Sequence, residues 1–219
     1  YLRDAGISFE IVSGISSAYS VPAWAGIPVT HRGVATSFHV ITGHEKNDKD
    51  ATAVDYQFLA KEKGTLVFLM GLNHLREIAH KLIAGGKSVH TPAAVIQSGC
   101  TARQRTATGR LIEIADIVEK EGLQTPAIIV IGEVVALQEK LEWLQDQPLS
   151  GKKILLTGTR HYIKELEEKL ESMGAETIAI SLIETQAIQK DESDALLKDI
   201  SNYNWVTFVS VAANRVREC

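Results

Sequence analysis

The sequence predicts an α/β fold, and three observations carry this prediction. Short aliphatic or β-branched runs end at a glycine or a polar turn, and most of them precede an amphipathic stretch. Runs such as residues 127–131 are continuously apolar, which is typical of strands that are covered on both faces. Apolar residues make up 45% and charged residues 23% of the 219-residue chain, so a packed core is expected.

The individual elements follow from these runs in chain order. We expect strands at residues 9–12, 37–42, 66–70, 93–97, 127–131, 154–157, 177–180 and 205–209. We expect helices at residues 15–25, 56–63, 75–84, 111–120, 135–144, 163–173 and 195–200. Pro22 falls inside the first helix and should kink or restart it. Gly122 follows a helical pattern where a left-handed cap is needed, and the polar run 44–50 indicates a surface loop.

The chain divides best at a polar stretch that contains Pro148 and Gly151. We therefore predict a first domain over residues 1–145, a linker over 146–151 and a second domain over 152–219. The formal charge of -4 is too mild and of the wrong sign for a protein that coats nucleic acid. The two cysteines form no disulfide framework, and no apolar run reaches the ~18 residues of a membrane span. These observations favour a cytoplasmic protein without a membrane or nucleic-acid partner.

Glycines follow several of the predicted strands. Gly14, Gly71, Gly99 and Gly132 each lie just beyond an apolar run, where an open α/β sheet presents its ligand crevice. A glycine there lets a ligand approach the backbone, although any one of them is also compatible with an ordinary tight turn. Together they favour a cleft for a small molecule.

Two cationic loops accompany these glycines. Residues 98–110 contain three arginines and no acidic residue, and Thr30-His31-Arg32 forms a second basic turn. Arginines in such loops bind carboxylates or phosphates, or they serve only solubility. Cys100 stands close to Arg103, which would lower the pKa of a thiol, but no partnered histidine accompanies it.

The familiar nucleotide and metal motifs are absent from the sequence. Gly86-Lys87-Ser88 resembles the end of a P-loop, but Lys81 stands where the first glycine is required. The sequence has no Gly-x-Gly-x-x-Gly, and His39 and His44 lack partners at metal-ligand spacing. We predict no metal site.

Several motifs resemble one known family. They are Gly14-Ile15-Ser16-Ser17-Ala18, residues 25–33 and 40–44, Met70-Gly71, Arg103-Gln104-Arg105 and residues 131–135. In this order they resemble the tetrapyrrole methylases over residues 1–145. The resemblance implies the family's C-terminal subdomain, a mixed sheet flanked by helices, and C-methylation of uroporphyrinogen III to precorrin-2 for sirohaem and cobalamin. A precorrin methyltransferase of the same family and a non-catalytic binding module are the alternatives.

The resemblance also implies ligands and site residues. S-adenosyl-L-methionine would be the methyl donor, with no metal, and the family is typically dimeric, so we expect a homodimer. The donor pocket would be lined by Ser16, Ser17, Met70 and Gly99, with Val134 and Val135 nearby. The carboxylates of the substrate would bind His31, Arg32, Arg103 and Arg105. The catalytic residues stay unassigned.

The remaining part resembles a second family. Residues 149–157, 174–176, 182–184 and 205–210 look like the beginning of uroporphyrinogen-III synthase. This resemblance predicts a partial parallel α/β lobe over 152–219 and a second activity, a synthase whose product is the substrate of the methyltransferase. The methylase family's N-terminal subdomain would precede residue 1, so we expect the chain to lack most of it and to be inactive by itself.

Overall fold

A computed structural model describes residues 1–43, 54–184, 198, 202, 204, 205 and 207. Its internal contacts divide the chain into two compact units. The first comprises Tyr1–Lys153 and Met173–Glu176, and the second comprises Ile154–Ser172 and Thr177–Cys219. The short piece 173–176 therefore belongs with the first unit although it follows the second unit's helix in sequence.

The first unit is built on a five-stranded sheet with the order β1-β2-β5-β3-β4. Its strands are β1 (Phe38–Thr42), β2 (Thr65–Leu69), β3 (Pro92–Gln97), β4 (Arg105–Arg110) and β5 (Ala127–Ile131). β1 and β2 are parallel, whereas β5 is antiparallel to both β2 and β3, and β4 is antiparallel to β3. The expected mixed sheet is thus present, and it sets which strand ends share an edge.

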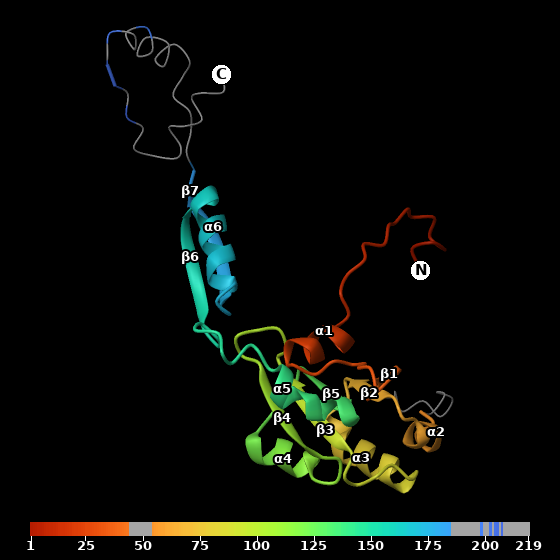
Figure 1. Cartoon of the computed structure of the whole chain (residues 1–219). Helices are drawn as coiled ribbons and strands as arrows, with labels where there is room; N and C mark the ends of the chain where they lie inside the picture. The colour runs from red at the N-terminus through yellow and green to blue at the C-terminus, as the bar shows by residue number, and fades with distance from the viewer. Residues whose placement is uncertain (44–53, 185–197, 199–201, 203, 206, 208–219) are drawn as a thin grey trace. The chain divides into compact units, whose positions relative to one another are not determined.

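Both faces of the sheet are covered, as the continuous apolar runs predict (Figure 1). Alternate residues of a strand point to opposite faces. Phe68, Val95 and Ile129 face a core shared with α2 (Tyr56–Lys61), α3 (Leu75–Ala84) and α4 (Ile114–Glu121). Their neighbours Val67, Ile96 and Val130 face α1 (Ser17–Trp24) and the 3-10 helix η2 (Glu133–Leu137).

One helix end follows its sequence prediction, and Pro22 lies within the first helix. Gly122 adopts a left-handed conformation with φ 67° after α4, where a side chain would be strained. Pro22 lies in the last turn of α1, which ends two residues later at Trp24. Two short helices complete the first unit, η1 (Leu72–His74) and α5 (Gln138–Leu141).

The second unit contains β6 (Lys153–Thr159), α6 (Arg160–Glu171) and β7 (Glu176–Ile183). β6 and β7 form a two-stranded sheet. Ile163 of α6 and Leu156 of β6 are buried, whereas Leu155, Leu182 and Ile183 are exposed. The strands expected at 154–157 and 177–180 and the helix at 163–173 therefore exist, each with shifted ends.

Three expectations were wrong in detail. Residues 9–12 form no strand, because no neighbouring strand among the described residues pairs with their backbone, and Ile11 and Val12 stay 85% and 84% exposed. β4 was not predicted because it is the outermost strand on its side of the sheet and its residues are mostly polar. The helix expected at 135–144 is only η2 followed by one turn of α5. The polar loop at 44–50, the helix at 195–200 and the strand at 205–209 fall largely or wholly outside the described residues.

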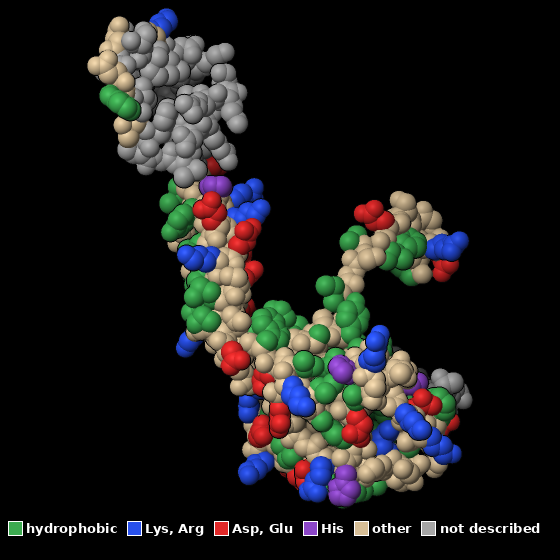
Figure 2. All heavy atoms as spheres, viewed as in Figure 1, with side chains coloured by type: hydrophobic (Ala, Val, Ile, Leu, Met, Phe, Trp, Pro, Cys, Tyr) green, Lys and Arg blue, Asp and Glu red, His purple; other side chains and the backbone are tan. Residues whose placement is uncertain are grey.

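The described surface agrees with the mild net charge. On the face of the first unit shown in Figure 2, acidic and basic side chains are interspersed. Within the described part of the chain, none of the helices has both the length and the apolar character that a bilayer crossing requires. Nor do three His, Cys, Asp or Glu side chains come together there in a way that would hold a metal ion.

Candidate functional site

One edge of the five-stranded sheet gathers most of the residues that the sequence singled out. β1, β2 and β3 end there, and β5 and β4 begin there, because β5 runs antiparallel to β2 and β3 and β4 runs antiparallel to β3. We call this the candidate edge and define it by Gly43, residues 70–71, residues 98–105 and residues 125–126. Met70 follows β2 and Gly99 follows β3, on either side of the first residue of β5.

Backbone strain is concentrated at this edge. The non-glycine residues with positive φ among those that the structure describes are Met70 (φ 56°), Ser98 (φ 49°) and Cys100 (φ 61°). Each left-handed residue of this kind costs about 1–3 kcal/mol and persists only where its surroundings hold it. Such residues cluster at ligand sites, so their common location supports the candidate edge as a functional site.

The ends of β1 and β2 approach each other closely at this edge. The Gly43 N–H donates to the Leu69 carbonyl at 2.7 Å. A Cβ on Gly43 would lie 2.5 Å from the Gly71 Cα, and one on Gly71 would lie 3.0 Å from Ile78 Cδ1. Met70, which directly precedes Gly71, is 67% exposed. The thioether therefore stands free for a ligand while the backbone around it is tightly packed.

The N-terminal half of α1 meets the loop after β3. Ser16 is the N-cap of α1, where its hydroxyl accepts a hydrogen bond from the Ala18 N–H at 3.2 Å. One turn later, Val21 packs so closely on Gly99 that a Cβ on the glycine would lie 2.6 Å from Val21 Cγ2. Ser20 hydrogen-bonds the Cys100 thiol. The helix whose N-terminus carries Ser16 and exposed Ser17 thus packs on the loop that contains Gly99.

The loop that carries the arginines is ordered by its own side chains. The Cys100 N–H donates to Gln104 Oε1 at 2.9 Å, and the Thr101 hydroxyl donates to the Ser98 carbonyl at 2.8 Å. Arg103 is exposed, and the Arg105 guanidinium donates to the Glu121 carbonyl at 2.9 Å. We call residues 98–105 the arginine loop. The Arg105 side chain thus reaches toward the end of α4.

The thiol of Cys100 lies in this loop. Burial raises the pKa of the Cys100 thiol, and the hydrogen bond with Ser20 opposes this shift only in part. The net shift is thus opposite to the lowering that a neighbouring arginine would cause. Cys100 therefore lacks the thiolate character of a nucleophile.

Other predicted residues lie away from the candidate edge. Gly132 follows β5, which is antiparallel to β2, so it lies at the opposite edge, where its N–H donates to the Pro92 carbonyl at 2.9 Å. Val134 and Val135 are 0% and 5% exposed and pack in the core beneath α1. Gly14 precedes α1 in a segment without a strand, and a Cβ there would meet open space.

The second cationic loop occupies a separate place. His31 forms an isolated bridge with Ala35, and its Nδ1 lies 2.9 Å from the Arg32 carbonyl. Both His31 and Arg32 are exposed. This turn leads into the start of β1, the end of that strand opposite Gly43. The structure therefore joins Arg103 and Arg105 with Met70 at one edge but does not bring His31 and Arg32 to it.

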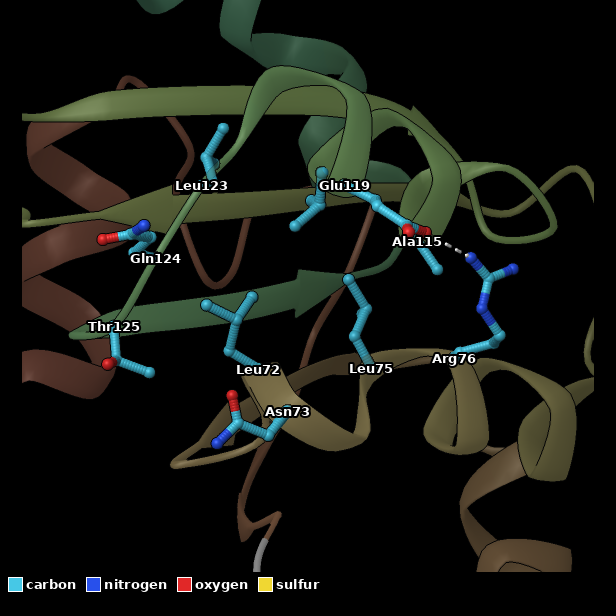
Figure 3. Close-up of a pocket in the computed structure, with 10 residues that line it drawn as sticks. Leu72, Asn73, Leu75, Arg76, Ala115, Glu119, Leu123, Gln124 and Thr125 are labelled. Atoms are coloured by element: carbon cyan, nitrogen blue, oxygen red, sulfur yellow. Dashed lines mark hydrogen bonds and ion pairs between the residues drawn. The ribbon is translucent and has the colours of Figure 1, made fainter.

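A hollow of about 410 Å³ lies between α3 and α4 (Figure 3). Leu72 and Leu75 face Leu123 across it. Its cation, Arg76, is paired with Asp116 at 2.7 Å and Glu119 at 3.1 Å, which raise the pKa of the guanidinium. Because this charge already has two partners, we assign no anionic ligand to the hollow.

A smaller hollow, of about 300 Å³, adjoins the arginine loop. Trp24, Arg105 and Glu142 are among the residues that line it. Trp24 packs edge to face on Trp143 with ring centroids 5.1 Å apart. The loop is therefore supported on one side by α1 and on the other by residues that follow η2.

One contact of the arginine loop could not be found from local sequence. The Ala102 N–H donates to the Glu176 carboxylate at 2.8 Å across 74 residues of sequence. No motif within the loop indicates that partner, because the contact depends on how residues 173–176 return to the first unit. Ser98 and Gln104 were missed as well, since their part is to hold backbone rather than to carry charge.

Comparisons with known proteins agree with this architecture. The family model described as Tetrapyrrole (Corrin/Porphyrin) Methylases matches residues 1–115. "Uroporphyrinogen-III C-methyltransferase" of Bacillus subtilis is 38% identical over 209 residues, which are 95% of this chain and 43% of that protein. "Porphyrin biosynthesis protein HemD" of Ruminiclostridium josui is 34% identical over 214 residues, 95% of this chain and 42% of that one.

A solved structure is also similar to this chain. The uroporphyrin-III C-methyl transferase of Thermus thermophilus, complexed with S-adenyl homocysteine, superposes with a TM-score of 0.52 at 30% identity. The match covers 62% of this chain and 57% of that protein. The chain thus spans less than half the length of the two relatives named above and somewhat more than half of the solved structure.

Proposed function

The chain belongs to the tetrapyrrole methylase family, and on that premise we propose that it is part of an S-adenosyl-L-methionine-dependent C-methyltransferase acting on uroporphyrinogen III. The observation that supports this most is the candidate edge, where three strained residues, the exposed Met70 thioether and the arginine loop occur together. The names of the Bacillus and Thermus relatives support the choice of reaction.

The residues of the edge fit the methyl donor. Exposed Met70 offers a polarizable thioether to pack on a flat base. Gly99 lets α1, which carries Ser16 and Ser17, pack directly on the loop after β3. The Ser16 hydroxyl accepts from the Ala18 N–H and still has its O–H to donate to a ligand and one lone pair to accept with. We assign Ser16, Ser17, Met70 and Gly99 to the donor. Val134 and Val135 support the pocket only as packing beneath α1.

The donor supplies an electrophilic methyl group on a positively charged sulfur. We propose that this part of the chain holds the two reactants in position and excludes water from them. A pocket that aligns the acceptor carbon with that methyl group lowers the barrier by bringing the two into contact without further loss of freedom. The fixed backbone of the candidate edge suits this role, because it need not reorganise when the ligands bind.

The arginines suit a substrate with many carboxylates. Arg103 and Arg105 are exposed on the arginine loop, and guanidinium groups bind carboxylates bidentately. We assign both to the tetrapyrrole. His31 and Arg32 form a second cationic turn at the far end of β1, and we propose that they bind other carboxylates of the same macrocycle.

We also propose that residues 152–219 are the beginning of a uroporphyrinogen-III synthase region, with residues 1–145 as the methylase part. The resemblance of residues 149–157, 174–176, 182–184 and 205–210 to that family supports this. The alignments to the Bacillus and Ruminiclostridium relatives span 95% of the chain, so the part after residue 115 also occurs in them. A homodimer and a cytoplasmic location complete the proposal, and sedimentation of the purified protein tests the first of these.

Product mass tests the reaction. The chain, mixed with a separately expressed N-terminal subdomain of the family, is incubated with the donor and uroporphyrinogen III. We expect the doubly methylated product, precorrin-2. Methylation of a precorrin with no reaction of uroporphyrinogen III would assign the chain to another branch of the family. Binding of donor and substrate without any product would favour a non-catalytic module.

A further inference from the structure

The arginine loop is held from outside the sheet by a segment that follows the methylase part in sequence. Glu176 Oε2 accepts the Ala102 N–H at 2.8 Å, and Glu176 Oε1 lies 2.6 Å from the Lys153 ammonium. All three residues belong to the first compact unit, so the contact is internal to it. One carboxylate thus joins the middle of the arginine loop to the start of β6.

The surroundings of Glu176 keep this carboxylate charged and in place. The hydrogen bond with Lys153, the Ala102 N–H and the charge of Arg103 lower its pKa, against the opposing effect of burial. The Glu176 N–H donates to the Lys152 carbonyl at 2.9 Å, and the Leu149 N–H donates to the Met173 carbonyl at 3.0 Å. Residues 149–153 and 173–176 therefore form one hydrogen-bonded support.

The arginine loop contains strained residues that its neighbours must hold in place. It contains two left-handed residues, Ser98 and Cys100, whose conformation costs free energy unless neighbours fix it. Its internal hydrogen bonds join Ser98 to Thr101 and Cys100 to Gln104. Ala102, which directly precedes Arg103, has its N–H satisfied by Glu176.

We propose that Glu176 is a positioning residue, which sets the conformation of the arginine loop and so the affinity of Arg103 and Arg105 for the tetrapyrrole carboxylates. This inference rests on the proposed function for its ligand. It assigns to the segment after the linker a role in the methylase site, in addition to any role in a synthase region.

A positioning role of Glu176 and a purely electrostatic effect of its charge change the tetrapyrrole affinity in opposite directions. A carboxylate beside Arg103 weakens the attraction for an anionic ligand, so its removal alone would tighten binding. Loss of a contact that positions the arginine loop would weaken that binding. Glu176→Ala removes both the charge and the hydrogen bond, whereas Glu176→Gln removes the charge but keeps an oxygen that can accept from the Ala102 N–H.

The first test needs no tetrapyrrole. Trypsin cleaves after Arg103, and we expect Glu176→Ala to raise the rate of cleavage there by about tenfold, in line with the loss of one charge-assisted hydrogen bond. Glu176→Gln should be cleaved at nearly the wild-type rate. The control is Glu139→Ala, which removes an exposed glutamate of α5 in the same unit. Equal cleavage of Glu176→Ala and wild type would overturn the inference, whatever the ligand.

The second test measures affinities for uroporphyrinogen III and for S-adenosylhomocysteine by calorimetry. We expect Glu176→Ala to bind the tetrapyrrole about tenfold more weakly and the donor product unchanged, with Glu176→Gln close to wild type. Tighter tetrapyrrole binding by Glu176→Ala would show that only its charge matters and would contradict the inference. If the wild type itself binds no tetrapyrrole, the proposed function fails, while the proteolysis result still decides whether Glu176 holds the loop.

Discussion

Val21 of α1 and Gly99 of the arginine loop are in direct contact, and the space between them leaves no room for a side chain at position 99. A Cβ there would lie 2.6 Å from Val21 Cγ2 and closer still to Cγ1. The absence of a side chain at Gly99 therefore fixes the distance between α1, which carries Ser16 and Ser17, and the end of β3. This contact ties the proposed donor residues together.

The contact predicts a suppressor. Gly99→Ala should destabilise the chain by about 1–3 kcal/mol, because the added methyl group overpacks the contact with Val21. Val21→Ala removes the two methyl carbons nearest to the new Cβ and leaves only Val21 Cβ, at 2.9 Å, so the double variant should regain part of the loss. Chemical denaturation of the four proteins gives the coupling. Additive effects of the two substitutions would show that the contact is not the cause.

Met70 carries backbone strain and side-chain function at once, and two variants separate them. Met70→Gly relieves the left-handed strain and should stabilise the chain by about 1 kcal/mol. Met70→Ala keeps that strain and should give no such gain. Both lose the thioether, so both should bind S-adenosylhomocysteine about tenfold more weakly. Donor binding by Met70→Ala at wild-type strength would remove Met70 from the proposed pocket.

The two cationic turns can be compared directly. Arg103→Ala and Arg32→Ala should each weaken uroporphyrinogen III binding by tenfold or more while leaving the donor almost unaffected, because a guanidinium–carboxylate pair is lost. Calorimetry with both ligands measures this. Equal loss of the two affinities in either variant would contradict its assignment to the substrate.

A pH dependence follows from Glu113, which caps the turn between β4 and α4. Its hydrogen bonds with the Arg110 guanidinium and the Arg110 N–H lower its pKa from 4.5 to about 2. Since the folded pKa lies below the unfolded one, the stabilisation is present above about pH 4.5 and is lost as the pH falls toward 2. Thermal unfolding should therefore separate wild type from Glu113→Gln at pH 6, with a difference that shrinks between pH 4.5 and 3. A constant difference across that range would exclude this cause.

Sequence patterns predicted the sheet well where burial is strong. β2, β3 and β5 are continuously apolar because helices cover both faces, and their positions followed directly. β4 was not predicted, since an edge strand such as Arg105–Arg110 has one apolar residue buried, Ala107, and looks like a polar loop. The segment 9–12 has the composition of a strand, but composition cannot supply the neighbour that a strand requires.

The site was predictable only in part for a related reason. Gly71 and Gly99 lie at one edge, as expected, but Gly132 lies at the other, because no local pattern indicates that β5 runs antiparallel to its neighbours. The left-handed conformations of Met70, Ser98 and Cys100 and the contact between Ala102 and Glu176 are likewise consequences of tertiary packing. Residue types identified candidates, and the topology decided which of them meet.

Hydrogen exchange on binding S-adenosylhomocysteine tests the shared site most directly, with the chain alone and with a separately expressed N-terminal subdomain of the family. If the candidate edge binds the donor, peptides covering residues 16–21, 69–71 and 98–104 gain protection together in at least one of these two conditions. The amides of β4 and α4 keep their exchange rates. Protection of the hollow between α3 and α4 instead, or no protection at the candidate edge in either condition, would contradict this prediction.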